Sequence, residues 1–492
     1  MEKLVVIGSG FGGLSAALRM RKKGYEVTLV EAQPDLGGRA RVFRKDGFHF
    51  DAGPTVITAP YLIDELFEMF GKDSKDYLEL LPVDPFYRVV FDDGREFDYV
   101  GDEERLFEQI RKFNPDDVEG YKKLAEHAKR IFDVGYVQLA DKPFSNVADM
   151  IKVIPQMVSL QNYKSVYSLV SKYIKSPELR QVFTFEPLLV GGNPMSITSI
   201  YLLIHWLERK WGVYFPKGGT GALVNALAKL MEEEGIKIKT SAAVEKIETD
   251  DAGKVQAVLL KTGERLECDK IVSNADPSTV YHNMVDEKFR SKHSNKKIEK
   301  RHPSMSLFVA YFGTNKKFEN LKHHTILLGP RYKGLLEDIF DKKVLADDFS
   351  LYLHAPARSD EGMAPDGKDS FYVLSPVPNN TSGIDWDVEG PKYMDKIMKH
   401  LDERHMPGLL DSLETSFYIT PDYFQKEMQS FGGSAFGLEP RFTQSAYFRY
   451  HNRSEEIDGL YFVGASTHPG AGVPGVLNSA KVLDKVIPSL NV

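Results

Sequence analysis

Three glycines near the beginning of the chain have the spacing of a phosphate-binding loop. Gly8, Gly10 and Gly13 follow the apolar residues 4–7 and precede a stretch with apolar residues at helical spacing. A second apolar stretch then ends at Glu31, eighteen residues after Gly13. In such a unit, glycines let the backbone approach a pyrophosphate at the helix N-terminus, and the acid accepts a hydrogen bond from a ribose hydroxyl. The pattern predicts a dinucleotide-binding site.

The same glycine spacing recurs near the other end of the chain, at Gly470, Gly472 and Gly475. Only seventeen residues follow Gly475, too few for a second nucleotide-binding unit of about 30 residues with its own acid. We therefore interpret these glycines as the turn from a last buried strand into a C-terminal helix over about 473–487. Pro474 suits the first turn of that helix, because the amide it lacks has no partner there. A glycine-rich connector without a ligand is the alternative.

The residues after the acid indicate which dinucleotide binds. The chain continues through GGR, residues 37–39, and FDAGPT, residues 50–55, instead of entering another strand–helix unit. Arginine makes planar, charge-assisted contacts with phosphate. Over residues 5–55 the sequence resembles flavin-dependent oxidoreductases of the amine oxidase and carotenoid desaturase group, in which GGR and FDxGPT flank FAD. The alternatives are a surface arginine for Arg39 and a strand-end turn for Asp51.

Motifs typical of bacterial phytoene desaturases continue over nearly the whole chain. In order they are FNPDDVEGY, LLVGGNP, WGVYFPKGGTGALV, SNAD, DFSLYLHAP, DWDVEGP, GSAFGLEP, TQSAYFR and LYFVGASTHPGAGVPGV. One local departure is FRYHN, where Tyr450 stands in place of the proline usual in that family. Flavin amine oxidases often carry an acid after the glycine of the last strand, whereas here Ala465 and Ser466 follow Gly464. The resemblance implies that the backbone of Val244 lies near the adenine and Gly464 near the flavin.

The glycine and acid pattern of residues 4–31 and the family resemblance together predict which residues bind FAD. They are Gly8, Gly10, Gly13, Glu31, Gly38, Arg39, Gly53, Pro54, Thr55, Val244, Gly464, Gly472, Val473 and Pro474. The C-terminal helix would point its N-terminus at the flavin, where the partial positive charge of its amides favours electron density on the reduced ring. Because no second complete nucleotide unit is present, we do not expect NAD(P) as an obligatory partner.

Composition and charge set limits on the class of protein. The 492 residues are 42% hydrophobic and 27% charged, which is ordinary for a globular protein of two or three domains. Its net charge of −7 argues against nucleic acid as a partner. A single cysteine, Cys268, excludes an internal disulfide and a paired-cysteine redox centre, and we expect no metal site. We find no signal peptide and no apolar run of about 18 residues, so we expect a cytoplasmic location, peripheral to the membrane.

The order of the patterns indicates an α/β fold: a Rossmann-like FAD-binding domain, a strand-rich substrate domain and a helical insert. Apolar residues at three- and four-residue spacing dominate 102–211, whereas apolar and aromatic runs such as SLFVAYFG, DFSLYLHAP and SFYVLSPV follow Pro303. We therefore divide the chain as follows. Residues 1–95, 213–292 and 455–492 form the FAD-binding domain, 96–212 the insert for membrane contact and substrate access, and 293–454 the substrate domain.

The resemblance implies a hydrophobic polyene substrate, and such a substrate implies contact with the membrane surface. Removing phytoene from a bilayer into water would cost on the order of 30 kcal/mol, at about 0.8 kcal/mol for each carbon group. The enzyme would therefore take the substrate directly from the cytoplasmic side of the cell membrane through an apolar tunnel. Residues 146–169 mix Met150, Ile151 and Ile154 with Lys152 and Lys164, as an interfacial helix does. An amphipathic helix on a soluble core is the alternative.

The reaction implied is stepwise desaturation of phytoene toward lycopene, with hydride transfer to the flavin and loss of a proton from the neighbouring carbon. Asp149, a carboxylate among apolar residues, is our candidate for a catalytic group, because its charge could oppose a developing allylic cation. A helix-capping or solvated aspartate is the alternative. His468 lies beside the glycine turn, where a structural role is more common. Electrons would leave the reduced FAD for oxygen or a membrane quinone.

Other functions share these motifs and stay open. A carotenoid isomerase uses the same architecture with reduced FAD and no net oxidation, and a desaturase of the C30 substrate diapophytoene would look similar. A flavin amine oxidase acting on soluble amines has only the shared fingerprint in its favour. A carotenoid carrier without enzymatic activity would have no need of a complete flavin site.

Overall fold

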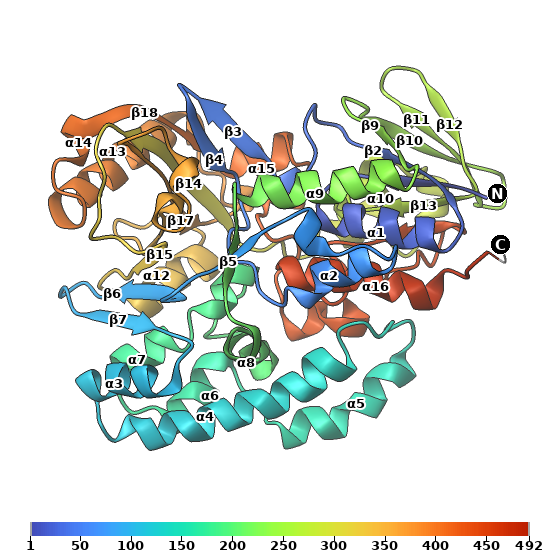
Figure 1. Ribbon diagram of the computed structural model, residues 1–492. Coiled ribbons are helices and arrows are strands. Elements are labelled where there is room, and N and C mark those ends of the chain that lie inside the picture. Colours follow the sequence, from blue (N-terminus) through green and yellow to red (C-terminus); the bar gives the residue numbers. More distant parts are fainter. Residues whose placement is uncertain (1, 491–492) are drawn as a thin grey trace.

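The computed structural model describes residues 2–490 and contains two large sheets above a layer of helices (Figure 1). The first sheet is five-stranded and entirely parallel, in the order β19-β13-β1-β2-β9. Its strands are β1 Lys3–Ile7, β2 Glu26–Val30, β9 Lys237–Lys239, β13 Lys270–Ser273 and β19 Leu460–Phe462. The strand predicted before the C-terminal glycines therefore joins the nucleotide-binding sheet, at its edge.

Alternate residues of β1 bury against different layers, as the two-residue period of a strand requires. Leu4 and Val6 pack with helices α1 Phe11–Lys22, α9 Thr220–Glu233 and α16 Val473–Val486. Val5 and Ile7 pack with a three-stranded antiparallel sheet on the other face. That sheet contains β10 Val244–Thr249, β11 Val255–Leu260 and β12 Arg265–Glu267. The central strand is thus covered on both faces, which explains its uninterrupted apolar sequence.

The second sheet has seven strands in the order β18-β14-β17-β16-β15-β6-β7, antiparallel except for the pair β6 and β15. The strands are β6 Tyr87–Val90, β7 Glu96–Tyr99, β14 Ser306–Thr314, β15 His324–Leu327, β16 Leu351–His354, β17 Asp369–Val377 and β18 Leu413–Ile419. The three predicted strands after Pro303 are confirmed as β14, β16 and β17. Residues 87–95, which we placed with the FAD-binding segments, belong to this sheet instead, because β6 pairs with β15 over 230 residues away.

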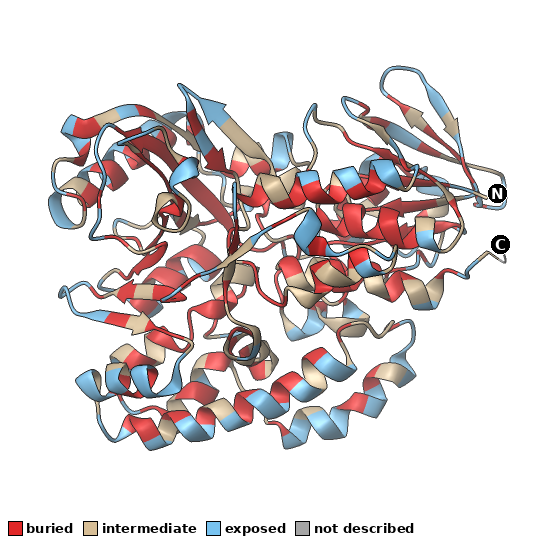
Figure 2. Cartoon of the chain, in the orientation of Figure 1, coloured by how far each residue is buried: buried red, intermediate tan, exposed pale blue. Residues whose placement is uncertain are grey.

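Helices α3 to α8 form the layer at the bottom of Figure 1 and confirm the helical character predicted for 102–211. They are α3 Glu103–Phe113, α4 Asp117–Phe132, α5 Val147–Ser159, α6 Val166–Tyr173, α7 Pro177–Val182 and α8 Leu203–Trp211. Buried side chains of this layer and of the seven-stranded sheet form one continuous apolar cluster. The layer is therefore packed against the second sheet, and Figure 2 shows its exposed side turned away from that sheet.

Shorter elements complete the fold. Two small antiparallel pairs are β3 Val42–Lys45 with β4 Phe48–Asp51, and β5 Leu80–Pro82 with β8 Tyr214–Pro216. The remaining helices are α2 Tyr61–Glu68, α10 Pro277–Asn283, α11 Asn295–Ile298, α12 Tyr332–Glu337, α13 Trp386–Arg404, α14 Leu409–Ser412 and α15 Pro421–Lys426. Among residues 2–490, none of the helices combines the length and the apolar character needed to cross a bilayer.

Candidate active site

A cavity of about 500 Å³ runs from the first glycine loop to the space between the second sheet and the helical layer. All of the predicted FAD-binding residues line it except Gly13. Its glycine-rich end lies at the carboxyl edge of the parallel sheet, where the loops after β1, β2, β13 and β19 meet. Ligands of open α/β sheets bind at this edge, because the strands deliver several loops to one place there.

The loop after β1 is shaped by contacts of its own backbone. Gly8 has φ of +90°, and Gly10 caps helix α1 without a side-chain hydrogen bond. A Cβ on Gly13 would lie 1.9 Å from the carbonyl oxygen of Gly8, so no other residue fits there without moving the loop. Gly13 therefore lies one layer behind the cavity wall, and its function is to let the helix approach the strand.

Glu31 stands at the end of β2 with its carboxylate facing the same loop. Its Oε2 accepts hydrogen bonds from the backbone amide of Ser9, at 2.8 Å, and from Ser9 Oγ, at 2.6 Å. Its Oε1 accepts the amide of Gln33 at 2.9 Å. The side chain is buried but lines the cavity, so it is held in one orientation from which a ribose hydroxyl could add a further hydrogen bond.

Asn274, which directly follows β13, is a site residue that we did not predict, although SNAD was among the motifs. Its amide lies between the two glycine-containing loops. A Cβ on Gly10 would lie 2.7 Å from Asn274 Nδ2, and a Cβ on Gly12 or Gly464 would lie 2.5 or 2.8 Å from Oδ1. The glycines at these three positions thus make room for one side chain that lines the cavity. The sequence signal that could have identified Asn274 is a polar residue directly after a predicted buried strand.

Arg39 lies in the cavity wall, and its guanidinium is only partly satisfied. Nη2 donates a hydrogen bond to Ser430 Oγ at 2.6 Å, while the buried Nε has no partner among residues 2–490. Burial lowers the pKa of this arginine, and the charge of Asp276 acts in the opposite direction. A half-buried cation with a free donor beside a glycine-rich loop suits the negatively charged groups of a dinucleotide. The interpretation of Arg39 as a surface arginine is therefore wrong.

Asp51 caps the N-terminus of a helix, a different role from that of a residue in a strand-end turn. Its Oδ1 accepts the backbone amide of Thr220 at 2.8 Å, which places the carboxyl at the N-terminus of helix α9. Burial raises the pKa of Asp51 to about 7, although the hydrogen bonds from the helix amides oppose that shift. This acid is absent from the cavity wall, and it connects β4 to α9.

At the C-terminal glycine motif, Gly472 caps helix α16, and Val473 and Pro474 lie in its first turn. These three residues line the cavity, so the predicted helix and its orientation toward the ligand space are confirmed. A Cβ on Gly475 would lie 2.6 Å from the carbonyl oxygen of Gly470, the same relation as between Gly13 and Gly8. The first turn of α16 contains no acidic residue that would compete for its free amides.

His468 is a structural residue, as its position beside a turn suggested. Its Nε2 lies 2.8 Å from the carbonyl oxygen of Leu139, and the ring packs edge-on against Phe144. Burial lowers the pKa of His468 to about 4, so the ring is neutral at physiological pH. It is not part of the cavity wall.

The other end of the cavity is apolar. Residues of the helical layer, the second sheet and α12 form its wall, including Phe185, Leu188, Leu189, Leu207, Met305, Leu307, Val309, Ile326, Leu328, Leu335, Leu336 and Ile339. The few polar groups are mostly tyrosine hydroxyls. Tyr352 and Tyr372 hydrogen-bond Thr55 Oγ1 at 3.0 and 2.6 Å, so the predicted residue Thr55 marks the boundary between the two ends.

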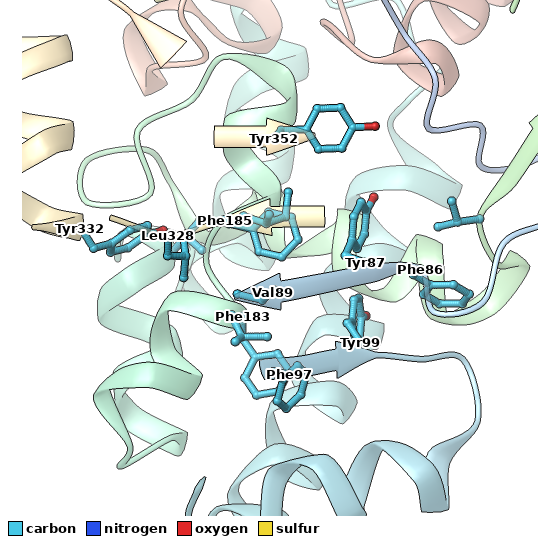
Figure 3. Packing of buried hydrophobic residues seen from close by; sticks show 14 of the residues in the cluster. Phe86, Tyr87, Val89, Phe97, Tyr99, Phe183, Phe185, Leu328, Tyr332 and Tyr352 are labelled. Atoms are coloured by element: carbon cyan, nitrogen blue, oxygen red, sulfur yellow. The ribbon is translucent and has the colours of Figure 1, made fainter. Parts of the chain in front are cut away.

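A buried pair of carboxyl groups interrupts the apolar wall. Glu208 of α8 lines the cavity, and Glu186 lies beside it, each about 1% exposed. Tyr87 donates a hydrogen bond to Glu208 Oε1 at 2.6 Å, and His205 Nδ1 lies 2.9 Å from Glu186 Oε1. Figure 3 shows Tyr87 reaching this region from β6, in the view between Tyr352 and Tyr99. We did not predict the pair, because 22 residues separate its members.

The protonation of the pair follows from its surroundings. Burial raises the pKa of both carboxyl groups, and the charge of Glu186 raises that of Glu208 further. Burial lowers the pKa of His205 to about 3, so the imidazole is neutral and cannot balance a carboxylate. The pair therefore holds protons under conditions in which exposed glutamates have lost them, and it can release or take up a proton beside the cavity.

The structure does not place Asp149 in the cavity wall, and the catalytic role of Asp149 stays a prediction. Asp149 lies in the first turn of α5, where its backbone amide donates a hydrogen bond to Asn146 Oδ1 at 3.0 Å. It is absent from the cavity wall. An acid in the first turn of an amphipathic helix interacts favourably with the helix dipole, which explains its place among apolar residues.

Comparison with known proteins agrees with this geometry. The family model described as flavin containing amine oxidoreductase matches residues 11–482. The chain belongs to this family. It is therefore an oxidoreductase, its cofactor is FAD, and the fold of the model is that of an α/β flavoprotein. Glu31, the unpartnered Arg39 Nε and the free N-termini of α1 and α16 fit that cofactor, and they would hold its ribose, its phosphates and its ring.

Two lycopene-forming phytoene desaturases are close relatives. The chain is 48% identical to the one of Pantoea ananas over 482 residues, which covers 98% of each chain. It is 46% identical to that of Paracoccus sp. over 486 residues, covering 99% of this chain and 97% of the other. A neurosporene-forming phytoene desaturase of Rhodobacter capsulatus is 41% identical over 493 residues, covering 99% and 94%. The resemblance to bacterial phytoene desaturases is thereby confirmed.

Solved structures share the fold at low sequence identity. An oxidoreductase of Methanosarcina mazei has a TM-score of 0.64 at 17% identity and covers 98% of this chain and 100% of its own. Cyclohexylamine oxidase of Brevibacterium oxydans has a TM-score of 0.60 at 16% identity and covers 99% and 98%.

Proposed function

We propose that this protein desaturates phytoene in successive steps toward lycopene. The observation that carries the proposal is one continuous cavity, which joins a dinucleotide end to an apolar end. A substrate without polar groups fits the apolar end, since few of its wall residues could form hydrogen bonds. The 46–48% identity to lycopene-forming desaturases over full length supports the substrate class.

The membrane is the proposed source of the substrate. Helix α5 carries exposed apolar side chains at positions of one helical face, Val147, Ile151, Ile154 and Val158, with exposed fractions of 47–59%. The cavity-wall residues Gly135, Tyr136 and Ala140 lie directly before this helix in the chain. A stripe of this kind enters the headgroup region of a bilayer and would bring this part of the cavity wall close to it. The proposed location is the cytoplasmic side of the cell membrane, as a peripheral protein.

Charge substitutions on α5 test this membrane contact. We expect Ile151→Lys together with Val158→Lys to reduce binding to liposomes about tenfold or more, because two apolar side chains leave the bilayer. The matched control is Val388→Lys on α13, which is 51% exposed and distant in the chain. Flotation of the purified holoprotein with liposomes measures the effect. Equal flotation of all variants would contradict a role for α5.

For the chemistry, bound flavin supplies a two-electron acceptor that takes a hydride from an allylic carbon. The residues of the chain exclude water from the apolar end and hold the neighbouring proton. We assign that proton to the Glu208–Glu186 pair, because Glu208 is an acid in the apolar wall and the second carboxyl can share the charge. Loss of hydride and proton from adjacent carbons leaves one new double bond. Turnover then depends on oxygen or a quinone as the proposed electron acceptor.

Production of a coloured carotene in a host that makes only phytoene tests the function. We expect absorption at the longer wavelengths of a more conjugated product, with reduction of acceptor in proportion to the double bonds formed. A product with the formula of its substrate would instead indicate an isomerase, and conversion of diapophytoene in preference would indicate a C30 desaturase. Anaerobic turnover with and without added quinone identifies the acceptor.

A further inference from the structure

Three buried histidines converge next to the cavity wall and are not part of the proposed flavin chemistry. His324 and His354 are directly paired across strands β15 and β16, and His323 immediately precedes β15. All three are at most 4% exposed, and one ring nitrogen of each lies within 4.8 Å of the others. We propose that His323, His324 and His354 form a binding site for a divalent transition metal ion of the zinc type.

The direction of a hydrogen-bond chain shows that His324 offers a lone pair to the cluster. Tyr372 can only donate to the carbonyl oxygen of Gly53, at 3.3 Å, because a carbonyl has no proton. When Tyr372 donates to Gly53, Thr55 donates to Tyr372, at 2.6 Å, and Tyr352 donates to Thr55, at 3.0 Å, because each hydroxyl has one proton. The hydroxyl oxygen of Tyr352 therefore accepts the proton of His324 Nδ1, at 2.6 Å.

This order leaves Nε2 of the neutral His324 without a hydrogen. Nε2 is buried and has no hydrogen-bond partner among the described residues. A bare ring nitrogen facing two other imidazoles is an unsatisfied acceptor, and such an atom is rare in a protein interior. A metal ion would satisfy it.

The other two rings have the separation expected of ligands. Nε2 of His323 and Nε2 of His354 are 3.2 Å apart. Two nitrogens on one tetrahedral zinc ion, each about 2.0–2.1 Å from the metal, lie about 3.3 Å from each other. Nδ1 of His323 lies 2.7 Å from Ser359 Oγ, so this ring, like His324, has a hydroxyl partner on the nitrogen that faces away. Zinc-binding histidines commonly have such a partner, which fixes the ring and its tautomer.

The chemistry of the ligands selects the metal. Three imidazole nitrogens suit Zn²⁺ and neighbouring divalent transition metals, whereas Mg²⁺ and Ca²⁺ prefer oxygen. The Tyr87 ring packs 5.7 Å from the ring of His324, and its hydroxyl donates to Glu208, so a buried acidic pair lies one side chain away from the added positive charge. A bound ion would join β15 to β16 and, through His324, hold Tyr352 beside the predicted FAD residue Thr55. The proposal differs from our expectation of no metal from sequence, and metal analysis decides between them.

Metal analysis of the purified holoprotein tests the site. We expect about one zinc ion per chain after gel filtration without chelator, and an X-ray absorption spectrum with nitrogen ligands at about 2.0–2.1 Å. We expect His354→Gln to lose this metal, while the control His49→Gln, at an exposed position of β4, retains it. Tyr352→Phe removes the hydroxyl that contacts both His324 and Thr55, and it should weaken zinc affinity about tenfold.

The flavin content and melting temperature of each variant show whether it has folded. If His354→Gln does not fold, the metal content and the absorption spectrum of the unchanged protein decide the question. Absence of stoichiometric metal from the unchanged protein, together with no uptake after incubation with zinc chloride, would overturn the proposal. The three rings would then be only a hydrogen-bonded part of the core. Neither result depends on whether phytoene is the substrate.

Discussion

The two glycine motifs of this chain have the same spacing and related backbone geometry but different neighbours. In each, the third glycine lies against the carbonyl of the first, and the middle glycine begins a helix that lacks a side-chain cap. The first motif follows β1, which is paired on both sides, and it faces Glu31. The second follows the edge strand β19, and neither helix has an acid in its first turn. We therefore expect identical spacing to create an affinity site at one end of the cofactor and an environment for its reactive ring at the other.

Alanine substitution of the third glycine of each motif should reveal the largest difference in stability between the two loops. In Gly13→Ala the new Cβ would lie 1.9 Å from Gly8 O, and in Gly475→Ala it would lie 2.6 Å from Gly470 O. We expect a loss above about 3 kcal/mol of unfolding free energy for Gly13→Ala and about 1–3 kcal/mol for Gly475→Ala. Denaturant unfolding and the flavin content measure both. The control Gly362→Ala has its nearest contact at 3.2 Å and should be nearly neutral.

At the apolar end, replacement of the wall carboxyl should slow the reaction. We expect Glu208→Gln to reduce the rate of flavin reduction by phytoene about 100-fold, while FAD stays bound, because a positioned proton acceptor contributes about 100-fold or more. Asp149→Asn, in the first turn of α5, should change the rate less than about twofold. Stopped-flow reduction under anaerobic conditions measures both variants. A larger effect of Asp149→Asn would reinstate our original candidate.

The rate of flavin reduction by phytoene should change with pH in one direction. Because burial raises the pKa of both Glu186 and Glu208, the pair gains its ability to accept a proton only as pH rises through those raised values. The rate in the unchanged protein should therefore increase with pH, and Glu208→Gln should flatten the profile.

At the glycine-rich end, Glu31→Gln should affect affinity and leave the chemistry intact. The change weakens charge-assisted hydrogen bonds to Ser9 and to a ribose hydroxyl, and each such bond contributes about 1.5–3 kcal/mol. We expect FAD to bind about 10- to 100-fold more weakly and the maximal rate to return at excess FAD. A reduced rate at saturating FAD would show that the first loop also acts on the flavin ring.

Helix α9 provides the contrast to both loops, because its N-terminus is capped by a carboxyl group of the protein. Burial raises the pKa of Asp51 from the usual 3.8 to about 7, so the folded protein binds this proton more tightly than the unfolded chain between those values. Stability should therefore fall by up to about 1.4 kcal/mol per pH unit as pH rises through this window. Asp51→Asn should remove that slope, and the exposed Asp76→Asn should keep it. Unfolding free energies from pH 4 to pH 7 measure the difference.

Much of the cofactor site could be predicted because its signals are local. A glycine turn between a strand and a helix, with an acid after the next strand, occupies residues 4–31. The pattern is specific because all of its parts must occur together at the right spacing. The amphipathic helices of the insert and the strands after Pro303 were equally visible, since burial on one face produces a period in the sequence. The family resemblance added Val244 and Gly464, which have no such signal.

The remaining contacts had no local signal. Pairing of β6 with β15, the insertion of Asn274 between two glycine loops, and the meeting of Glu186 with Glu208 all join segments that the sequence pattern treats independently. Asp149 shows the limit of a local signal, because a carboxylate among apolar residues marks a helix turn as readily as a catalytic group.

The sequence by itself determined the dinucleotide loop, the flavin family and the order of helices and strands, because these depend on residues within one turn, strand or helix. Only the tertiary structure decided which acid lines the cavity and which histidines meet. Their free energies of ionisation and ligand binding depend on burial and on neighbours from distant segments, and these surroundings form only when the chain folds.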